Sequence, residues 1–177
     1  FTLPSTWFSQ RVFLVFEGAM TDTSAKLNGE SVGPTHQGGF CRFQYDVTPF
    51  LKYGATNKLE VEVAKHSANE SVNQTERLAD SWVFGGIHRP VYLEAVPPQF
   101  IERVAIDARA DGAFTMDVFA NSLTNADTLE AQITALEGKP LGPAFAQKLT
   151  GDKTTLKTQV NSPRQWTAET PNLCRVE

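Results

Sequence analysis

The sequence predicts an all-β protein built from two sandwich domains. Short runs rich in β-branched and aromatic residues recur along the chain, separated by turns of glycine, proline, asparagine and aspartate, and helix signals are scarce. Pro97 and Pro98 interrupt this pattern, stiffen the backbone and remove two amide donors. The 177 residues, 41% of them hydrophobic, are enough for one or two globular domains. We therefore expect a first domain over residues 1–98 and a second over residues 99–177.

Three strand signals stand out in the first half. Residues 11–17 carry apolar side chains on both faces, which fits a strand buried between two sheets. Residues 24–27 lead into Asn28-Gly29, the strongest short signal for a hairpin turn. Residues 58–63 alternate strictly, so their leucine and two valines should face the core while their lysine and two glutamates face outward.

Three segments between these strands read as connections. Residues 33–39 are rich in glycine and are expected at the surface. Residues 46–51 carry helix-cap residues and a proline near a first helical turn, which indicates one short helix or 3₁₀ turn. Residues 65–80 form a long polar connection, and connections of this length are usually functional or mobile. This last segment is therefore a candidate to line a site.

The second half contains short strand signals at regular spacing. Glycine, aspartate, asparagine and proline separate them, a pattern typical of a sandwich. The candidates are residues 101–108, 114–120, 128–136, 145–150, 154–160 and 173–177.

Composition argues against several classes of partner. The formal net charge of -4 and the absence of lysine or arginine runs offer little attraction to nucleic acid, and no apolar run approaches the ~20 residues that span a bilayer.

Cys41 and Cys174 occupy positions where strands take apolar residues, so we expect core thiols and no disulfide. His36, His66 and His88 are too scattered for metal-ligand spacing. We expect no metal and no cofactor.

The most distinctive passage is residues 80–93, with the sequence DSWVFGGIHRPVYL. It combines an aromatic pair, a glycine pair and a lone arginine within one strand-loop-strand stretch. The glycines permit positive φ or close backbone approach, and the proline after Arg89 favours an extended arginine. Two interpretations stay open: a recognition loop, or a glycine-kinked strand whose Trp82 and Phe84 belong to the core of an ordinary sandwich.

This passage resembles the segment that closes the N-terminal sugar-binding domain of glycoside hydrolase family 2, the β-galactosidase, β-glucuronidase and β-mannosidase group. Residues 163–173, PRQWTAETPNL, resemble the end of the immunoglobulin-like domain of that family. Four earlier segments, in order, match the sugar-binding domain: FEGA at 16–19, LNG at 27–29, GGF at 38–40 and DVTPFL at 46–51. The resemblance covers nearly the whole chain. It implies a galactose-binding-like jelly-roll sandwich followed by an immunoglobulin-like β-sandwich.

The resemblance also implies that this chain is a non-catalytic fragment. Its 177 residues leave no room for the (β/α)8 barrel that carries the catalytic glutamates of the family, and no acid pair can be nominated here, so we expect no catalytic residue. Residues 1–7 match a mid-domain stretch, which implies a jelly roll truncated at its N-terminus. The implied partners are a β-glycoside and the missing barrel domain. An edge left by absent strands would favour a homo-oligomer. Bacterial cytoplasm, periplasm and secretion all stay open.

Four residues form the expected substrate-binding set. In the family, the aspartate at the position of Asp80 reaches into the active site on the barrel and accepts hydrogen bonds from sugar hydroxyls, in some members near a bound cation. The alternative is that Asp80 only organises its own loop. Trp82 could stack on a sugar or pack in the core, and Arg89 could bind substrate or tie down neighbouring carbonyls. His88, beside Arg89, completes the set.

Two other functions compete with a part of a β-galactosidase-like hydrolase. The chain could be a free-standing carbohydrate-binding module, for which sandwich folds and aromatic loops serve equally. It could also be an adhesion or oligomerisation protein, because a fold does not fix a function. The sequence does not name the glycoside.

Overall fold

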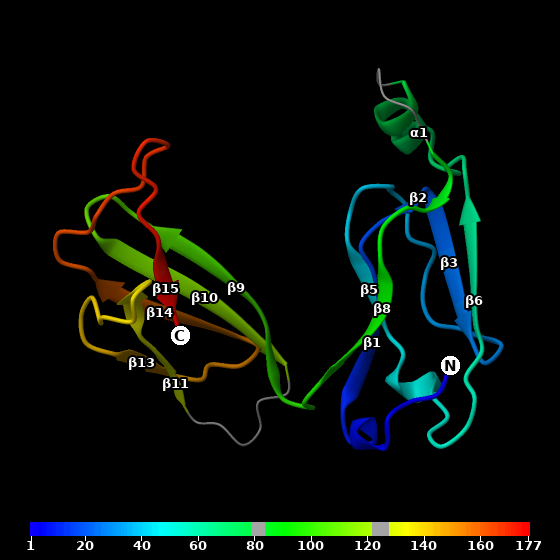
Figure 1. Ribbon diagram of the computed structural model, residues 1–177, viewed down its shortest axis with the longest axis horizontal. Helices are drawn as coiled ribbons and strands as arrows, with labels where there is room; N and C mark the ends of the chain where they lie inside the picture. The colour runs from blue at the N-terminus through cyan, green and yellow to red at the C-terminus, as the bar shows by residue number, and fades with distance from the viewer. Residues whose placement is uncertain (79–83, 122–127) are drawn as a thin grey trace. The chain divides into compact units, whose positions relative to one another are not determined.

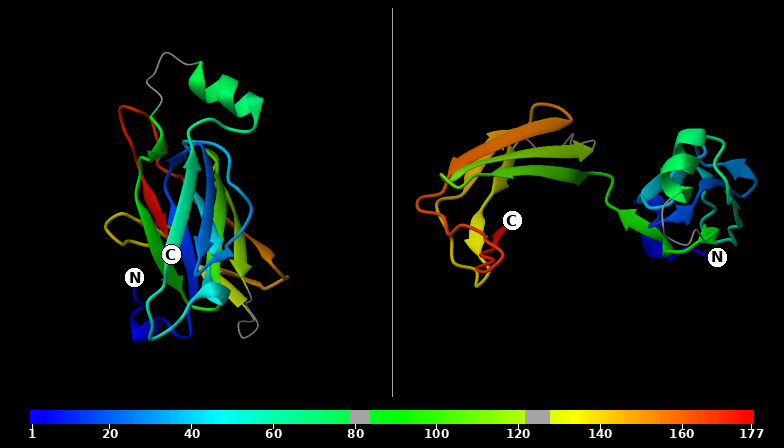
Figure 2. Two further views of the ribbon diagram at one scale, coloured as in Figure 1. Left: turned by 90° about the vertical axis from the view of Figure 1, so that its right-hand side faces the viewer. Right: turned by 90° about the horizontal axis from the view of Figure 1, so that it is seen from above.

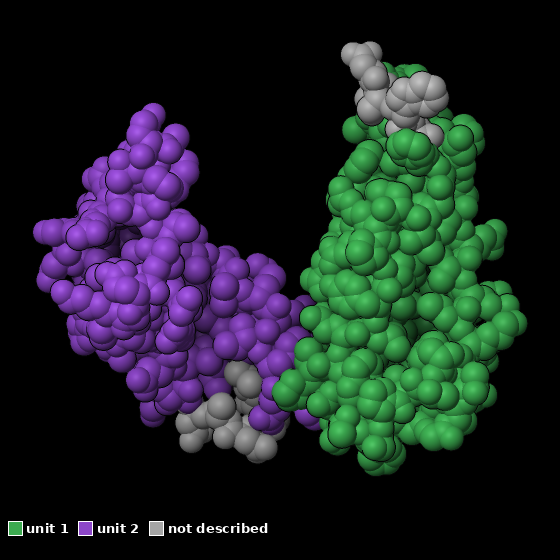
Figure 3. Space-filling view, viewed as in Figure 1, with its two compact units in different colours: residues 1–97 green, residues 98–177 purple. Residues whose placement is uncertain are grey.

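The computed structural model spans residues 1–177 and describes residues 1–78, 84–121 and 128–177. The chain forms two compact units, Phe1–Pro97 and Pro98–Glu177 (Figure 3). Both are built from β-sheets, which confirms the predicted all-β class.

The first sheet of unit 1 has a strand at its centre that is buried on both faces. This strand, β1 (Arg11–Phe16), pairs antiparallel with β5 (Phe43–Asp46) on one side and β8 (Val91–Val96) on the other. Every residue of β1 after Arg11 is buried. The expectation of a strand between sheets at residues 11–17 is confirmed.

The second sheet of unit 1 has β3 (Asp22–Leu27) between β4 (Glu30–Ser31) and β6 (Leu59–Ala64). Asn28 and Gly29 join β3 to β4 with φ of 55° and 91°, the two positive values that a type I′ hairpin turn requires. Along β6, half-buried residues alternate with exposed ones, as the sequence predicted.

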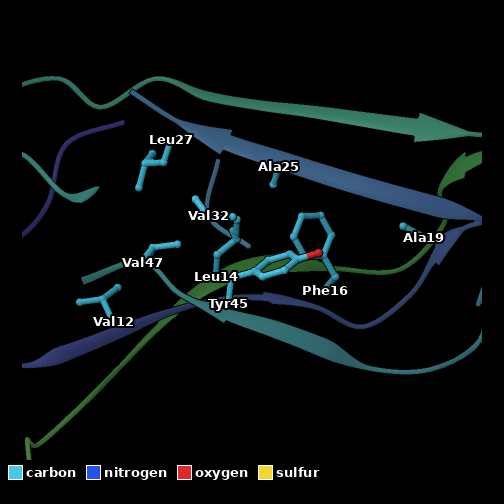
Figure 4. Packing of buried hydrophobic residues seen from close by; sticks show 9 residues of the cluster. All are labelled: Val12, Leu14, Phe16, Ala19, Ala25, Leu27, Val32, Tyr45 and Val47. Atoms are coloured by element: carbon cyan, nitrogen blue, oxygen red, sulfur yellow. The ribbon is translucent and has the colours of Figure 1, made fainter. Parts of the chain in front are cut away.

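The core of unit 1 lies between these two sheets. Side chains from β1, β3 and β5 point toward one another across the gap (Figure 4). Phe16 is fully buried and stacks on Phe43 with ring centroids 4.7 Å apart. The buried cluster consists of Val12, Leu14, Phe16, Ala19, Ala25, Leu27, Val32, Tyr45 and Val47.

Short elements complete unit 1. Strands β2 (Ala19–Met20) and β7 (Gly86–Ile87) pair antiparallel, and α1 (Glu70–Arg77) lies beyond the end of the sheets near β2 (Figures 1 and 2). Two 3₁₀ turns cover Ser5–Trp7 and Thr48–Phe50. The second confirms the turn expected at residues 46–51.

The described residues of unit 2 form three groups of paired strands. The largest is a three-stranded sheet in which β10 (Ala113–Asn121) lies between β9 (Phe100–Ala108) and β14 (Lys153–Gln159). The other two are the pairs β11 (Thr128–Ala131) with β13 (Phe145–Lys148), and β12 (Ile133–Ala135) with β15 (Cys174–Val176).

The single strand expected at residues 128–136 is broken at Gln132. The backbone of Gln132 exchanges hydrogen bonds of 2.9 and 3.0 Å with that of Glu177, and the chain changes partner from β13 to β15 at this point. The break depends on strands distant in the sequence, so local periodicity could not predict it.

The core of unit 2 leaves β9 uncovered. Met116 on β10 is 6% exposed, whereas Ile106, directly opposite on β9 and therefore on the same face, is 51% exposed. Val104 is likewise exposed beside the buried Val118. An apolar row on β9 thus flanks the core without being part of it.

The expectation of core thiols is wrong for both cysteines. Cys41 and Cys174 are free and exposed. Cys41 precedes β5 rather than lying within a strand, and Cys174 is the first residue of β15, which belongs to a two-stranded sheet. Position in the sheets, rather than residue type, sets their exposure.

Candidate functional site

The connection between β6 and β7 leaves the sheets of unit 1 and returns to the same place. The amide of Thr21, between β2 and β3, donates to the carbonyl of Ala64 at the end of β6 (2.7 Å). A Cβ atom on Gly85 would lie 3.2 Å from Cδ of Lys65. The two ends of this connection, residues 65–85 and called the excursion below, are therefore adjacent. The excursion carries α1 and the sequence of residues 79–83.

Helix α1 is a feature that the sequence analysis missed, because residues 65–80 read as a polar connection. The side chain of Asn69 caps its first turn by accepting from the Ser71 amide (3.0 Å). Glu70 in the first turn and Arg77 in the last match the helix dipole. No residue of α1 is buried. Polar contacts rather than a core must therefore hold it in place.

Asp22 provides one of these contacts. It is buried, and its Oδ2 accepts from the Ala68 amide (2.8 Å) and from Nε2 of Gln37 (3.1 Å). Burial by itself would raise the pKa of Asp22, but hydrogen bonds from Ser67, Ala68 and Gln37 outweigh it and lower the pKa overall. The carboxylate thus joins the start of the excursion to the glycine-rich loop.

Glu76 provides a second contact, in the last turn of α1. Its Oε1 and Oε2 accept from the Gly39 amide at 2.8 and 3.0 Å. Gly38 has φ of +117°, and a Cβ on Gly39 would lie 2.8 Å from Cε of Met20. The glycine pair is therefore required where the helix meets the sheets.

Arg89 ties the far end of the excursion to the same loop. Its Nη1 donates to the carbonyls of Phe40 (3.0 Å) and Glu17 (3.3 Å), and its Cδ would lie 2.9 Å from a Cβ on Gly18. These hydrogen bonds agree with the alternative in which Arg89 ties down neighbouring carbonyls. Binding of substrate by Arg89 stays a prediction.

The remaining predicted site residues divide into two groups. Asp80 and Trp82 lie outside the described residues. His88 is exposed, and its ring lies 6.1 Å from that of Phe40 in an edge-to-face arrangement. The structure therefore brings His88 and Arg89 together with the Gly38-Gly39 loop.

Exposed apolar side chains flank these contacts. Each lies within two residues of a segment already described or belongs to it: the glycine-rich loop, the end of α1 or β7. Such residues can contact a ligand or another protein surface. They are Phe40, Leu78, Phe84 and Ile87.

A charged network lies between the Glu17 turn and β8. The hydroxyl of Tyr92 donates to Oε1 of Glu17 (2.6 Å), and this hydrogen bond raises the pKa of Tyr92. Arg42 lies 3.4 Å from Glu17 and 3.1 Å from Glu94. Glu17 is thus held by a tyrosine and an arginine, as an ion-pair partner at the surface.

A shallow hollow of about 380 Å³ lies beside the glycine-rich loop. The His36 ring stacks on Phe43 (3.7 Å between centroids), and Phe43 stacks in turn on Phe16 of the core. The hollow was not expected from the sequence, although the period-two spacing of Phe43 and Tyr45 is a visible signal of a shared face. Its lining is Pro34, Thr35, His36, Gln37, Phe43, Gln44 and Tyr45.

The described residues contain neither a metal-binding cluster nor a membrane-spanning helix. Outside residues 79–83 and 122–127, no group of three or more histidine, cysteine, aspartate or glutamate side chains could hold a metal ion. Within the same residues, no helix is long and apolar enough to cross a membrane.

The sequence and the fold of this chain are similar to those of known glycosidases. The β-galactosidase of Clostridium acetobutylicum is 31% identical over 93% of this chain and 18% of its own length, and that of Halalkalibacterium halodurans is 29% identical over 99% and 17%. The crystal structure of a Bacteroides uniformis β-glucuronidase superposes with a TM-score of 0.81 at 27% identity, over 99% of this chain and 23% of that one. The chain thus spans less than a fifth of the length of these curated relatives. Residues 1–97 match the sugar binding domain of the glycosyl hydrolases family 2, and the chain belongs to this family.

Proposed function

We propose that this chain is the non-catalytic part of a β-galactosidase-like hydrolase, and that it supplies sugar-binding residues to an active site on a separate catalytic barrel. One observation carries the proposal. The sugar-binding family match covers unit 1, in which Asp22, Glu76 and Arg89 all make hydrogen bonds to residues 37–40. These three side chains fix an excursion that contains Asp80 and Trp82.

Asp80, Trp82 and His88 are the proposed sugar contacts. A carboxylate accepts hydrogen bonds from vicinal hydroxyls, and an indole offers an apolar face to sugar C–H groups. The bonds of Arg89 to two carbonyls support a structural role for that residue. We further propose that unit 1 is a jelly roll and unit 2 an immunoglobulin-like sandwich, because their sheets pack in the manner of β-sandwiches.

The test combines binding and turnover. Methyl β-galactoside, β-glucuronide and β-mannoside are titrated into the chain by NMR, and the matching nitrophenyl glycosides are assayed for release of nitrophenol. We expect weak binding of one sugar and no turnover, because the hydrolysis requires two suitably placed carboxyl groups. Turnover that is lost on mutation of one acid would contradict the proposal.

Asp80→Asn separates sugar binding from folding. Loss of a charged hydrogen bond costs about 1.5–3 kcal/mol, which lowers affinity roughly ten- to a hundredfold. Asp152→Asn, at an exposed turn of unit 2, is the matched control and should change nothing. Unchanged affinity in Asp80→Asn would favour the role of loop organiser.

Self-association is a second proposal. Strands β6 and β8 are the outer members of their three-stranded sheets, and outer strands expose unpaired backbone groups. Sedimentation at rising concentration should then show a dimer. A monomer at every concentration would contradict it.

A further inference from the structure

Few contacts hold α1 in position. Among the described residues, one of these contacts joins the carboxylate of Glu76 to the Gly39 amide. The helix has eight residues and buries none of them. Its N-terminal side is held by Asp22 through the Ala68 amide, and its last turn by Glu76 through the Gly39 amide. Loss of the second contact would free the end of α1 while leaving its beginning attached.

The backbone amide of Gly39 donates to the carboxylate of Glu76. Both oxygens of Glu76 lie within 3.0 Å of one amide nitrogen, and hydrogen bonds to a charged acceptor are stronger than those to a neutral one. A side chain at position 39 would meet Oε2 of Glu76 at 3.2 Å as well as Met20. The absence of a side chain is what allows Glu76 to reach the backbone.

The contact lies beside Met20, the residue with which the returning chain pairs. Asp80 follows Glu76 by four residues. On the return, Gly86 of β7 pairs with Met20, whose Cε lies 2.8 Å from the place of a Gly39 Cβ. The chain that enters the segment of Asp80 and Trp82 and the chain that leaves it are thus fixed within one small region.

We propose that Glu76 is a positioning residue for sugar binding: its carboxylate fixes the end of α1 on the Gly39 amide and thereby sets where the following segment begins. This role rests on the proposed function of Asp80 and Trp82. Glu76 itself touches no sugar. Its replacement acts on affinity only through the segment that follows it.

The experiment uses the whole 177-residue chain with Glu76→Ala, Glu76→Gln and the control Glu70→Gln. Glu70 is an exposed acid of the same helix, so its replacement changes the charge of α1 without touching Gly39. Exchange of the Gly39 amide by NMR reports the contact directly. We expect exchange at least about tenfold faster in Glu76→Ala, a smaller increase in Glu76→Gln, which keeps one acceptor oxygen, and none in Glu70→Gln.

Two further readouts test positioning rather than simple folding. The ¹⁹F signal of 5-fluorotryptophan at Trp82, assigned with Trp82→Phe, should shift or broaden in the same order of variants. The affinity for the sugar bound by the parent chain should fall about tenfold in Glu76→Ala, with partial retention in Glu76→Gln. Urea unfolding of the sheets should be unchanged, since Glu76 lies outside the core.

The outcomes separate this inference from the proposed function. A Trp82 signal that stays unchanged in Glu76→Ala, or an equal effect of Glu70→Gln, overturns the positioning role even if sugar still binds. Absence of sugar binding in every variant overturns the proposed function, and the positioning role for sugar binding falls with it. Faster Gly39 exchange, a changed Trp82 signal and weaker sugar binding together support both.

Discussion

The two units enclose their cores differently. In unit 1 the central strand β1 is buried on both faces, and Phe16 on it is fully buried. In unit 2 the central strand β10 alternates buried and half-buried residues, and its neighbour β9 exposes Ile106 on the core face. Both units are all-β, yet one has a closed core and the other an open side. Because the core of unit 1 is closed without any residue of α1, this helix can be held by polar contacts alone.

The largest effect should follow Phe16→Ala. Removal of a buried phenylalanine costs about 3–5 kcal/mol, because apolar contacts are lost and a cavity remains beside Phe43. Hydrogen exchange with mass spectrometry in urea should show unit 1 unfolding at a lower concentration and unit 2 unaffected. Phe8→Ala, at an exposed ring, is the control. Equal shifts in both units would mean that the cores unfold as one.

A matched pair on facing strands tests the open side of unit 2. Met116→Ala should cost about 2–5 kcal/mol, whereas Ile106→Ala, opposite it, should cost under about 1 kcal/mol, because Ile106 is already half exposed. The measurement is the unfolding midpoint of unit 2. Similar costs for the two variants would show that the face of β9 is covered in solution.

The two units should also differ, by a smaller amount, in how much folding stability they lose at low pH. Burial favours a raised pKa for Asp46, but bonds from Thr48 and Arg11 outweigh it, so the pKa is lowered overall, as for Asp22. A lowered pKa adds stability above the ordinary aspartate value of 3.8, and this stability is lost as pH falls through the lowered value. In unit 2, the pKa of Asp117, whose side chain is partly exposed, is lowered chiefly by its bond with Lys153.

We therefore expect unit 1 to lose about 1–3 kcal/mol below pH 4, since hydrogen bonds to the buried carboxylate of Asp22 are worth about that much and the partly exposed Asp46 adds less. Unit 2 should lose less, because Asp117 is partly exposed to solvent. Unfolding in urea at pH 7, 4 and 3 measures the difference. Asp22→Asn should reduce the acid sensitivity of unit 1. A steeper loss in unit 2 would contradict this account.

Local signals predicted much of the fold. The Asn28-Gly29 turn, the alternation of β6 and the turn at Thr48–Phe50 were all correct because neighbouring residues determine them. The break at Gln132 and the exposure of Cys174 depend on which strands pair, and the sequence does not state this locally.

The candidate site was predicted less completely. The cap at Asn69 and the charges of Glu70 and Arg77 were helix signals, but the helix has no apolar stripe and was read as a loop. The contact of Glu76 with Gly39 joins residues 37 positions apart, so spacing could not reveal it. Asp80 was identified through family resemblance alone, and its role stays a prediction.

The adjacency of Lys65 and Gly85 has a consequence for how such proteins diversify. An excursion that leaves and rejoins the sheets at one point can lengthen, shorten or be exchanged without shifting a strand, because its closure adds only slowly to the entropic cost. Residues 65–85 could therefore be replaced as one unit by a segment of another length or sequence. The sheets beneath, with their own hydrogen bonds and core, would inherit no change from such an exchange.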